Sequence, residues 1–165
     1  MKFKNFVLAF LIIGAIGTLN HFVYDLSGKN TIIGYFAPVN ESVWEHLKLL
    51  FFPTLIFSVF EYFLIKEKPQ NYPFAVSLSL LVGLISIVTI FYTYLGLLGF
   101  KIEWFNIAIY YIALLIMLIT KAILLSLKFK LEAVNWFSLI WIFVMALMFV
   151  FFTYNPLDLG IFKEP

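Results

Sequence analysis

Five long apolar runs, separated by short polar segments, dominate the chain. They lie at about residues 5–25, 43–65, 74–99, 104–127 and 134–154. Each run has about 20 residues or more, so as a helix rising about 1.5 Å per residue it can cross a hydrocarbon core about 30 Å thick. The runs are apolar on all faces and lack the alternation of transmembrane β-barrel strands. The pattern predicts an all-α bundle of five transmembrane helices, with residues 1–165 forming a single membrane domain.

Polar segments rich in glycine, proline and lysine fall where the spans should end. Ser27-Gly28-Lys29-Asn30 follows the first run, and residues 66–73 follow the second. The later connections are short, which favours antiparallel neighbours. The first run also fits a secretory signal peptide with a poor cleavage site at Ala15-Ile16-Gly17. Because it continues to Tyr24 and is then long enough to span, we expect it to remain as the first helix.

The lysines outside the runs are distributed unevenly between the two sides of the predicted bundle. If the N-terminus lies in the cytoplasm, six lysines face inward and three face outward. The inner set is Lys2, Lys4, Lys66, Lys68, Lys128 and Lys130, and the outer set is Lys29, Lys101 and Lys163. An excess of lysine in cytoplasmic loops predicts an N-in, C-out orientation.

Composition agrees with the membrane class and excludes several others. Hydrophobic residues make up 64% of the chain, charged residues make up 12%, and the mean hydropathy is +1.03. The absence of cysteine excludes disulfides and thiolate metal sites. A net charge of +2, with lysine as the only basic residue type, gives no nucleic-acid surface. The expected partner is the lipid bilayer, and we predict a multi-pass protein of a cell membrane.

Ionisable side chains inside the runs need an explanation. Each costs about 2.5–3.5 kcal/mol at the centre of a transmembrane segment, so each should have a partner or a role. The stretch from Asn40 to Lys48, at the start of the second run, contains half of them. The ionisable residues within the runs are His21, Glu45, His46, Lys48, Glu61 and Lys121, and those at the rims are Asp25 and Glu41.

The groups near the outer side predict a site between the first two spans. His21 and Asp25 are four residues apart and share one helical face. Glu41, Glu45 and Lys48 have the spacing of one face of the second helix. Imidazoles with carboxylates are typical ligands of zinc, and without a metal they can relay protons or receive a cation. The ligand-binding candidates are His21, Asp25, Glu41, Glu45, His46 and Lys48, and the metal candidates among them are His21, Asp25, Glu45 and His46. No cofactor is required by the sequence.

A structural interpretation of the same stretch stays open. Ser42-Val43-Trp44-Glu45 has the form of a capping box, in which Ser42 accepts from the backbone N–H of Glu45 and the Glu45 carboxylate accepts from the N–H of Ser42. Both Glu41 and Glu45 also suit the positive end of the helix dipole. Lys48 can pair with either glutamate or extend outward. Helix initiation therefore explains the glutamates without any function and leaves the histidines unexplained.

A second pair is predicted at the opposite side. Glu61 and Lys121 each lie one to two turns inside the cytoplasmic boundary, on the second and fourth spans. We predict that they form a salt bridge between these spans, the alternative being that both extend separately to the interface. Pro53, inside the second span, leaves the carbonyl of Leu49 without its helical donor.

The segment from Pro38 to Lys48, with the sequence Pro-Val-Asn-Glu-Ser-Val-Trp-Glu-His-Leu-Lys, runs into Phe52-Pro53 and follows His21 to Asp25. Together these residues resemble a family of small uncharacterised integral membrane proteins of bacteria and archaea. The likeness covers the whole chain. It implies a protein of the prokaryotic cytoplasmic membrane, from a family that has no assigned activity. Membrane hydrolases of the ceramidase type share the spacing of Ser42 and His46, but their second histidine pair is missing here, because the chain has only two histidines.

Three functional hypotheses follow. The first is a binding or transport protein whose outer polar cluster takes a proton, a cation or a small ligand. The second is a structural or partner protein whose cluster only fixes the first two spans. The third is a metal-dependent hydrolase acting at the outer leaflet, with His21, Asp25, Glu45 and His46 as ligands or base. The sequence leaves open whether the protein is an enzyme, with more weight on a protein that is not one and equal weight on the binding and the structural hypotheses.

Overall fold

The structure, a computed structural model, describes residues 3–127 and 132–165, and in these ranges it is helical without strands. Five long helices follow one another, which confirms the predicted all-α fold with five helices long and apolar enough to cross a membrane. They are α1 (Phe3–Leu26), α3 (Val43–Leu64), α4 (Tyr72–Leu98), α5 (Glu103–Ser126) and α6 (Glu132–Tyr154). Three lysines of the orientation argument, Lys2, Lys128 and Lys130, lie outside the described residues.

Two short elements were not predicted. The helix α2 (Thr31–Gly34) lies in the connection between α1 and α3, and the 3-10 helix η1 (Gly160–Phe162) lies in the C-terminal tail. The signal for α2 is Asn30, whose side-chain oxygen accepts from the backbone N–H groups of Ile32 and Ile33. The connection is therefore an ordered structure that covers the end of the bundle.

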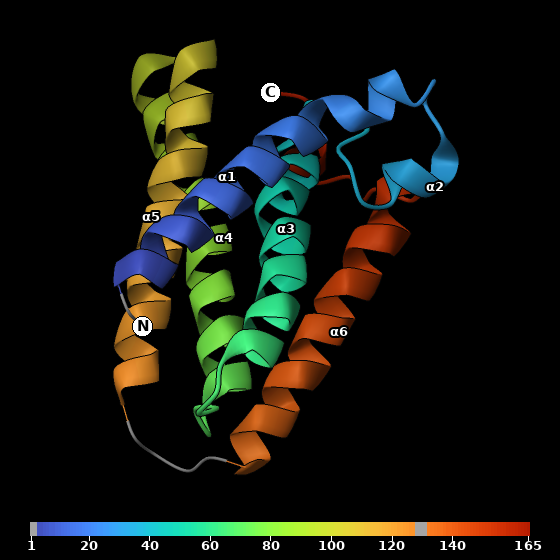
Figure 1. Ribbon diagram of the computed structural model, residues 1–165. Coiled ribbons are helices and arrows are strands. Elements are labelled where there is room, and N and C mark those ends of the chain that lie inside the picture. Colours follow the sequence, from blue (N-terminus) through green and yellow to red (C-terminus); the bar gives the residue numbers. More distant parts are fainter. Residues whose placement is uncertain (1–2, 128–131) are drawn as a thin grey trace.

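Helix α1 crosses obliquely over α3, α4 and α5 (Figure 1). Gly17 permits the crossing, because a Cβ there would overlap the Tyr110 hydroxyl and the carbonyl oxygen of Leu49. The Tyr110 hydroxyl donates to the Ile13 carbonyl oxygen at 3.0 Å and lies 3.5 Å from that of Leu49. The carbonyl that Pro53 leaves without a helical donor is thus met by a side chain of α5.

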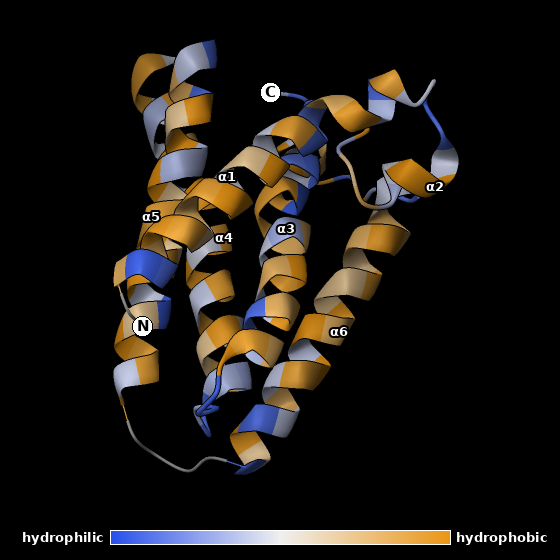
Figure 2. Ribbon diagram, in the orientation of Figure 1, coloured by the Kyte–Doolittle hydropathy of each residue, from blue (hydrophilic) through white to orange (hydrophobic). Residues whose placement is uncertain are grey.

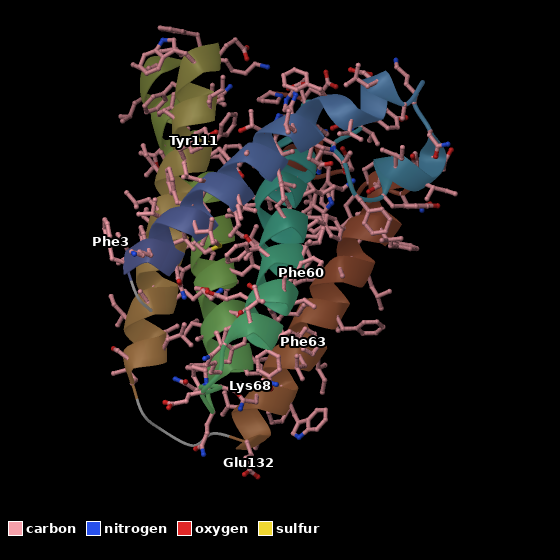
Figure 3. All side chains as sticks on the ribbon, in the orientation of Figure 1. Phe3, Phe60, Phe63, Lys68, Tyr111 and Glu132 are labelled. Atoms are coloured by element: carbon pink, nitrogen blue, oxygen red, sulfur yellow. The ribbon has the colours of Figure 1, made fainter. Side chains whose placement is uncertain are left out.

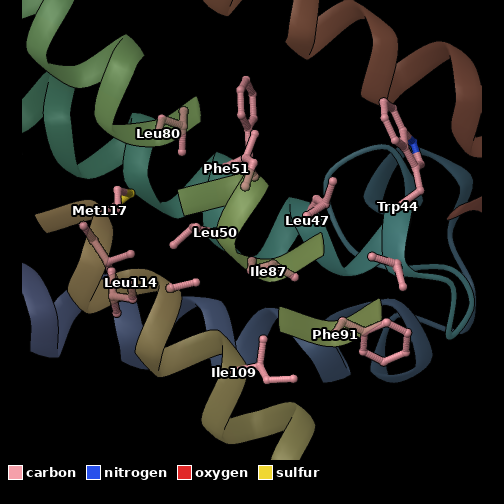
Figure 4. Close-up of a cluster of buried hydrophobic side chains, with 14 of the residues drawn as sticks. Trp44, Leu47, Leu50, Phe51, Leu80, Ile87, Phe91, Ile109, Leu114 and Met117 are labelled. Atoms are coloured by element: carbon pink, nitrogen blue, oxygen red, sulfur yellow. The ribbon is translucent and has the colours of Figure 1, made fainter. Parts of the chain in front are cut away.

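The core lies between α3, α4 and α5. Leu50, Leu80, Leu114 and Met117 are fully buried there (Figure 4). Large apolar side chains also cover the outside of the bundle, among them Phe60 and Phe63 of α3 (Figure 3). Polar residues gather near the helix ends (Figure 2). All five long helices are long and apolar enough to cross a membrane.

The two ends of the bundle are chemically different. At one end α1 finishes, α3 begins and the C-terminus lies nearby; we call this the histidine end (Figure 1). At the opposite end lie Lys68 and Glu132 (Figure 3). Helices α4 and α5 extend past α1 at the histidine end (Figure 1).

Candidate functional site

Two histidines meet between α1 and α3 at the histidine end. His21 lies in the last two turns of α1, and His46 lies in the first turn of α3. Their Nε2 atoms are 3.2 Å apart, and their rings are tilted with centroids 5.2 Å apart. The pairing follows from antiparallel neighbours joined by a connection that returns the chain to the same level.

Glu41 completes the cluster from the residue just before the helix cap. Its carboxylate oxygens lie 3.3 Å from Nε2 of His46 and 3.8 Å from Nε2 of His21. The three ligand atoms all fall within 4.8 Å of one another. Glu41 is more exposed than the histidines, with 59% of its side chain accessible against 34% for His21 and 28% for His46. The cluster is therefore open on the carboxylate side.

The tautomer of His46 follows from its other ring nitrogen. Nδ1 lies 2.9 Å from the carbonyl oxygen of Ser42, and because a carbonyl only accepts, Nδ1 carries the proton. In the neutral ring Nε2 then carries no proton, and its lone pair is directed at Glu41 and His21. A lone pair and a carboxylate 3.3 Å apart repel unless a positive charge lies between them. The cluster thus favours a shared proton or a metal cation.

The charge state of Glu41 suits this role. When Nε2 of His46 is also protonated, its hydrogen bond to Glu41 lowers the pKa of the Glu41 carboxyl below its ordinary value, and the charges of protonated His46 and His21 and of Lys101 act in the same direction, although partial burial opposes them. An ordinary glutamate is already ionised at neutral pH, and the lowered pKa keeps Glu41 ionised in more acidic solution as well. An ionised carboxylate beside two imidazoles is a donor set for a divalent cation.

A cavity of about 420 Å³ adjoins the cluster. Its polar lining includes the three cluster residues together with Lys101 and Glu103. Its apolar wall is formed by residues of α3, α4 and α5, which are Leu49, Ile87, Phe91, Ile107 and Ile109. A volume of this size suits one small ligand. The cluster therefore faces space that a molecule can enter.

Three of the six predicted ligand-binding residues, Asp25, Glu45 and Lys48, lie outside the cluster, and Glu41, which was not a metal candidate, belongs to it. Asp25 is exposed one turn beyond His21, and within the described parts of the chain its carboxylate has neither a hydrogen bond nor an ion pair. Glu45 is 2% exposed and turns away from the histidines. The expected single face of Glu41, Glu45 and Lys48 does not form, because Glu41 precedes the helix and follows the direction of the connection instead.

Glu45 and Lys48 form a separate buried pair, with Oε2 and Nζ 2.6 Å apart. The Lys48 ammonium also donates to the hydroxyl of Thr153 in α6 at 2.6 Å and to the carbonyl of Gly34 in α2 at 2.9 Å. The same carboxylate oxygen accepts from the backbone N–H of Val39 at 3.0 Å. The pair thus ties the connection, α3 and α6 together.

The capping box forms only in half. The Ser42 hydroxyl accepts from the backbone N–H of Glu45 at 3.4 Å, as expected. The backbone N–H of Ser42, however, donates to the Asn40 side chain at 3.0 Å rather than to Glu45. The Glu45 carboxylate is held by Lys48 and Val39, because a charge in the interior is better stabilised by an opposite charge than by one amide.

At the opposite end Glu61 and Lys121 lie against each other, with Oε2 and Nζ 2.5 Å apart. Both are nearly fully buried. The Tyr72 hydroxyl donates to the same carboxylate oxygen at 2.7 Å, and the Ser58 hydroxyl lies 3.3 Å from the ammonium. The sequence pointed to the ion pair but not to Tyr72 and Ser58, since a tyrosine near a helix end equally fits an interfacial anchor.

The cavity residues were also not identified from the sequence. In the sequence Lys101 and Glu103 belong to a short connection between two spans, and Tyr110 is one of several aromatic residues in an apolar run. Only the oblique crossing of α1 brings that connection close to the histidines. A lysine and a glutamate beside a connection carry no signal that distinguishes a cavity rim from an ordinary loop.

These features define the class of the protein as an all-helical chain with five helices able to cross a membrane and a histidine–glutamate cluster beside a cavity. Residues 2–165 match the model of a family of unknown function, DUF6512, and the chain belongs to this family. Membership in an uncharacterised family confirms the resemblance noted in the sequence. No curated protein and no solved structure matches the chain.

Proposed function

We propose that the protein is a multi-pass protein of the cell membrane that binds one divalent transition-metal ion, with zinc as the type case, at His21, Glu41 and His46. The observation that carries the proposal is the spacing of the donor atoms. Bonds of about 2.0–2.2 Å place the ligands of a tetrahedral zinc ion about 3.3–3.5 Å apart. The two Nε2 atoms are 3.2 Å apart, which is close to this range, and the Glu41 carboxylate faces both of them, with Oε2 3.3 Å from His46 and Oε1 3.8 Å from His21. One donor atom from each residue falls within 4.8 Å of the others, so a bound ion requires only a small movement of the carboxylate.

The hydrogen bond from Nδ1 of His46 to the Ser42 carbonyl supports the same proposal. Histidines that bind metals usually donate their other N–H to a carboxylate or a backbone carbonyl, which fixes the tautomer and the ring orientation. The contact between His46 and the Ser42 carbonyl is of this kind. The helix cap that the sequence predicts as structural thereby also orients a ligand.

Binding can be measured on the purified protein in a neutral detergent, by calorimetry with Zn²⁺ and by the visible absorption of a Co²⁺ complex. We expect one ion per chain and loss of binding in His21→Ala, Glu41→Gln and His46→Ala. Asp25→Asn is the matched control, since its carboxylate is exposed and outside the cluster. Free Zn²⁺ at about 100 times its Kd should raise the free energy of unfolding by about 2.7 kcal/mol.

The proposal fails if the folded wild-type protein binds neither ion. If His46→Ala then only destabilises the fold, the cluster has a structural role. If binding persists in Glu41→Gln but is lost in Asp25→Asn, the ion lies elsewhere on α1 and the assignment of Glu41 is wrong.

A hydrolytic activity is a second candidate, and one observation favours it. Two histidines and a glutamate leave a fourth zinc position for water, and catalytic sites differ from structural ones in keeping such a position open. The three candidate ligands line the cavity, so a molecule in the cavity lies beside the site. Bound water at zinc ionises near neutral pH and becomes a nucleophile. Zinc-dependent release of p-nitrophenol from a long-chain p-nitrophenyl ester, absent in His46→Ala, would support it.

A further inference from the structure

The cavity beside the cluster has two chemically distinct parts. The wall formed by α4 and α5 is apolar, with Ile87, Phe91 and Ile109 packed against one another (Figure 4). The charged lining residues Glu41, Lys101 and Glu103 belong to the segment before α3 and to the segment where α4 passes into α5, and both segments lie at the histidine end (Figure 1). A ligand that fits both parts has a polar head and a hydrocarbon chain.

The exposed residues that line the cavity also include both apolar and charged side chains. Phe22 of α1 and Ile107 of α5 line the cavity and are exposed, with 55% and 60% of their surface accessible. Both belong to helices that are long and apolar enough to cross a membrane. Exposed apolar side chains on such helices are stable in contact with lipid, so at Phe22 and Ile107 the cavity lining continues onto a surface suited to hydrocarbon. The polar rim, with Lys101 and Glu103, is exposed as well.

The charges at the polar end favour an anionic head. A divalent ion bound with Glu41 leaves a net charge of +1, while Lys101 and Glu103 balance each other. A single carboxylate neutralises the remaining charge and is itself a ligand for zinc. Lys101 is close enough to the cluster for its charge to act on Glu41, so it also acts on a head group placed there.

We propose that this cavity binds a long-chain fatty acid, with the carboxylate at the ion held by His21, Glu41 and His46 and the chain along Ile87, Phe91 and Ile107. The inference rests on the proposed metal site and adds the class of its ligand. A cavity of about 420 Å³ has the size of a pocket for one small molecule, which fits one chain.

The absence of cysteine from the chain allows a direct test. A single cysteine in Ile107→Cys reports on the cavity, and a single cysteine in Phe143→Cys, on the exposed face of α6, is the matched control. Sodium palmitate is added to the zinc-loaded protein in a neutral detergent, and the rate of reaction with N-ethylmaleimide is measured. At palmitate of about ten times its Kd the cavity cysteine should react about tenfold more slowly, because only the free fraction reacts.

The head group is tested with palmitic acid methyl ester, which has the same chain and no charge. We expect little protection by the ester, and weaker protection by palmitate in a Lys101→Gln background. Equal protection by acid and ester, or equal slowing at the α6 control, would overturn the proposal. Stronger protection by a lysophospholipid than by palmitate would assign the cavity to a phosphate head instead. Slowing that depends on protein concentration and not on palmitate would assign it to a second copy of the chain.

Zinc binding, measured separately by calorimetry on the same Ile107→Cys protein, separates this inference from the metal site. If zinc binds and palmitate gives no protection, the fatty-acid proposal is wrong and the metal proposal stands. If palmitate protects the His46→Ala variant as well as the unaltered site, the contact between head group and ion is wrong.

Discussion

Glu41 and Glu45 lie four positions apart in the chain and have different surroundings. Glu41 is exposed and faces two imidazoles, whereas Glu45 is buried and faces an ammonium. The difference comes from Ser42, the cap residue, whose extended backbone turns the chain into α3. A residue before the cap follows the direction of the connection, and a residue after it follows the helix.

This contrast predicts different phenotypes for two equivalent substitutions. Glu45→Gln leaves the Lys48 charge buried without its partner and should lower the free energy of unfolding by about 3–5 kcal/mol. Glu41→Gln should change it by less than about 1 kcal/mol, because the Glu41 side chain is mostly exposed. Chemical denaturation in detergent without added metal measures both. Equal losses in the two variants would contradict the separation of the two clusters.

At the scale of elements, α3 carries both buried ion pairs. Near its start Lys48 joins it to α2 and α6, and near its end Glu61 joins it to α5 and α4. In an apolar environment such contacts fix the rotation of each helix, because any other rotation leaves a charge without a partner. The same rotation directs His46 toward α1.

The contact between Glu61 and Lys121 can be tested by a double-mutant cycle. Glu61→Gln and Lys121→Gln should each lower stability by about 3–5 kcal/mol, since each leaves a buried charge unpaired. The double variant should lose less than the sum of the two, by at least about 1 kcal/mol. The control is Glu67→Gln, an exposed glutamate expected to change stability by less than about 0.5 kcal/mol. Additive losses would rule out an energetic coupling between α3 and α5 at this point.

At the scale of the whole molecule, the cluster, the cavity and the C-terminal residue lie at the same end of the bundle. The orientation that the lysines predict would place this end outside the cell. Under that orientation a metal ion reaches the cluster from outside, and an amphiphile reaches the cavity from the outer leaflet.

Single cysteines give a test of this orientation, using a membrane-impermeant maleimide on intact cells. Lys29→Cys, in the connection between α1 and α2, should be labelled in intact cells, and Lys66→Cys, between α3 and α4, only after the membrane is permeabilised. Both positions are exposed, so access depends on the side of the membrane. The reverse pattern would show that the histidine end faces the cytoplasm.

The sequence by itself determined the class and the helices of this protein. Runs of about 20 apolar residues leave few alternatives in a membrane, because every backbone polar group must be paired within its own helix. Caps and breakers are equally local, as Ser42 and Gly99 illustrate at the start of α3 and the end of α4. Antiparallel neighbours of similar length also place His21 and His46 at the same end of the bundle.

Only the tertiary structure decided which polar groups share a site. Glu45 could face the histidines or Lys48, and the choice depends on Thr153, a residue 105 positions beyond Lys48. Asp25 lies four residues from His21 on α1, yet it is exposed and outside the cluster. Glu41 belongs to the cluster instead, and Lys101 lines the cavity beside it. A helical period gives the angle between side chains on one helix but not the rotation of that helix against its neighbours, which packing of the whole core sets.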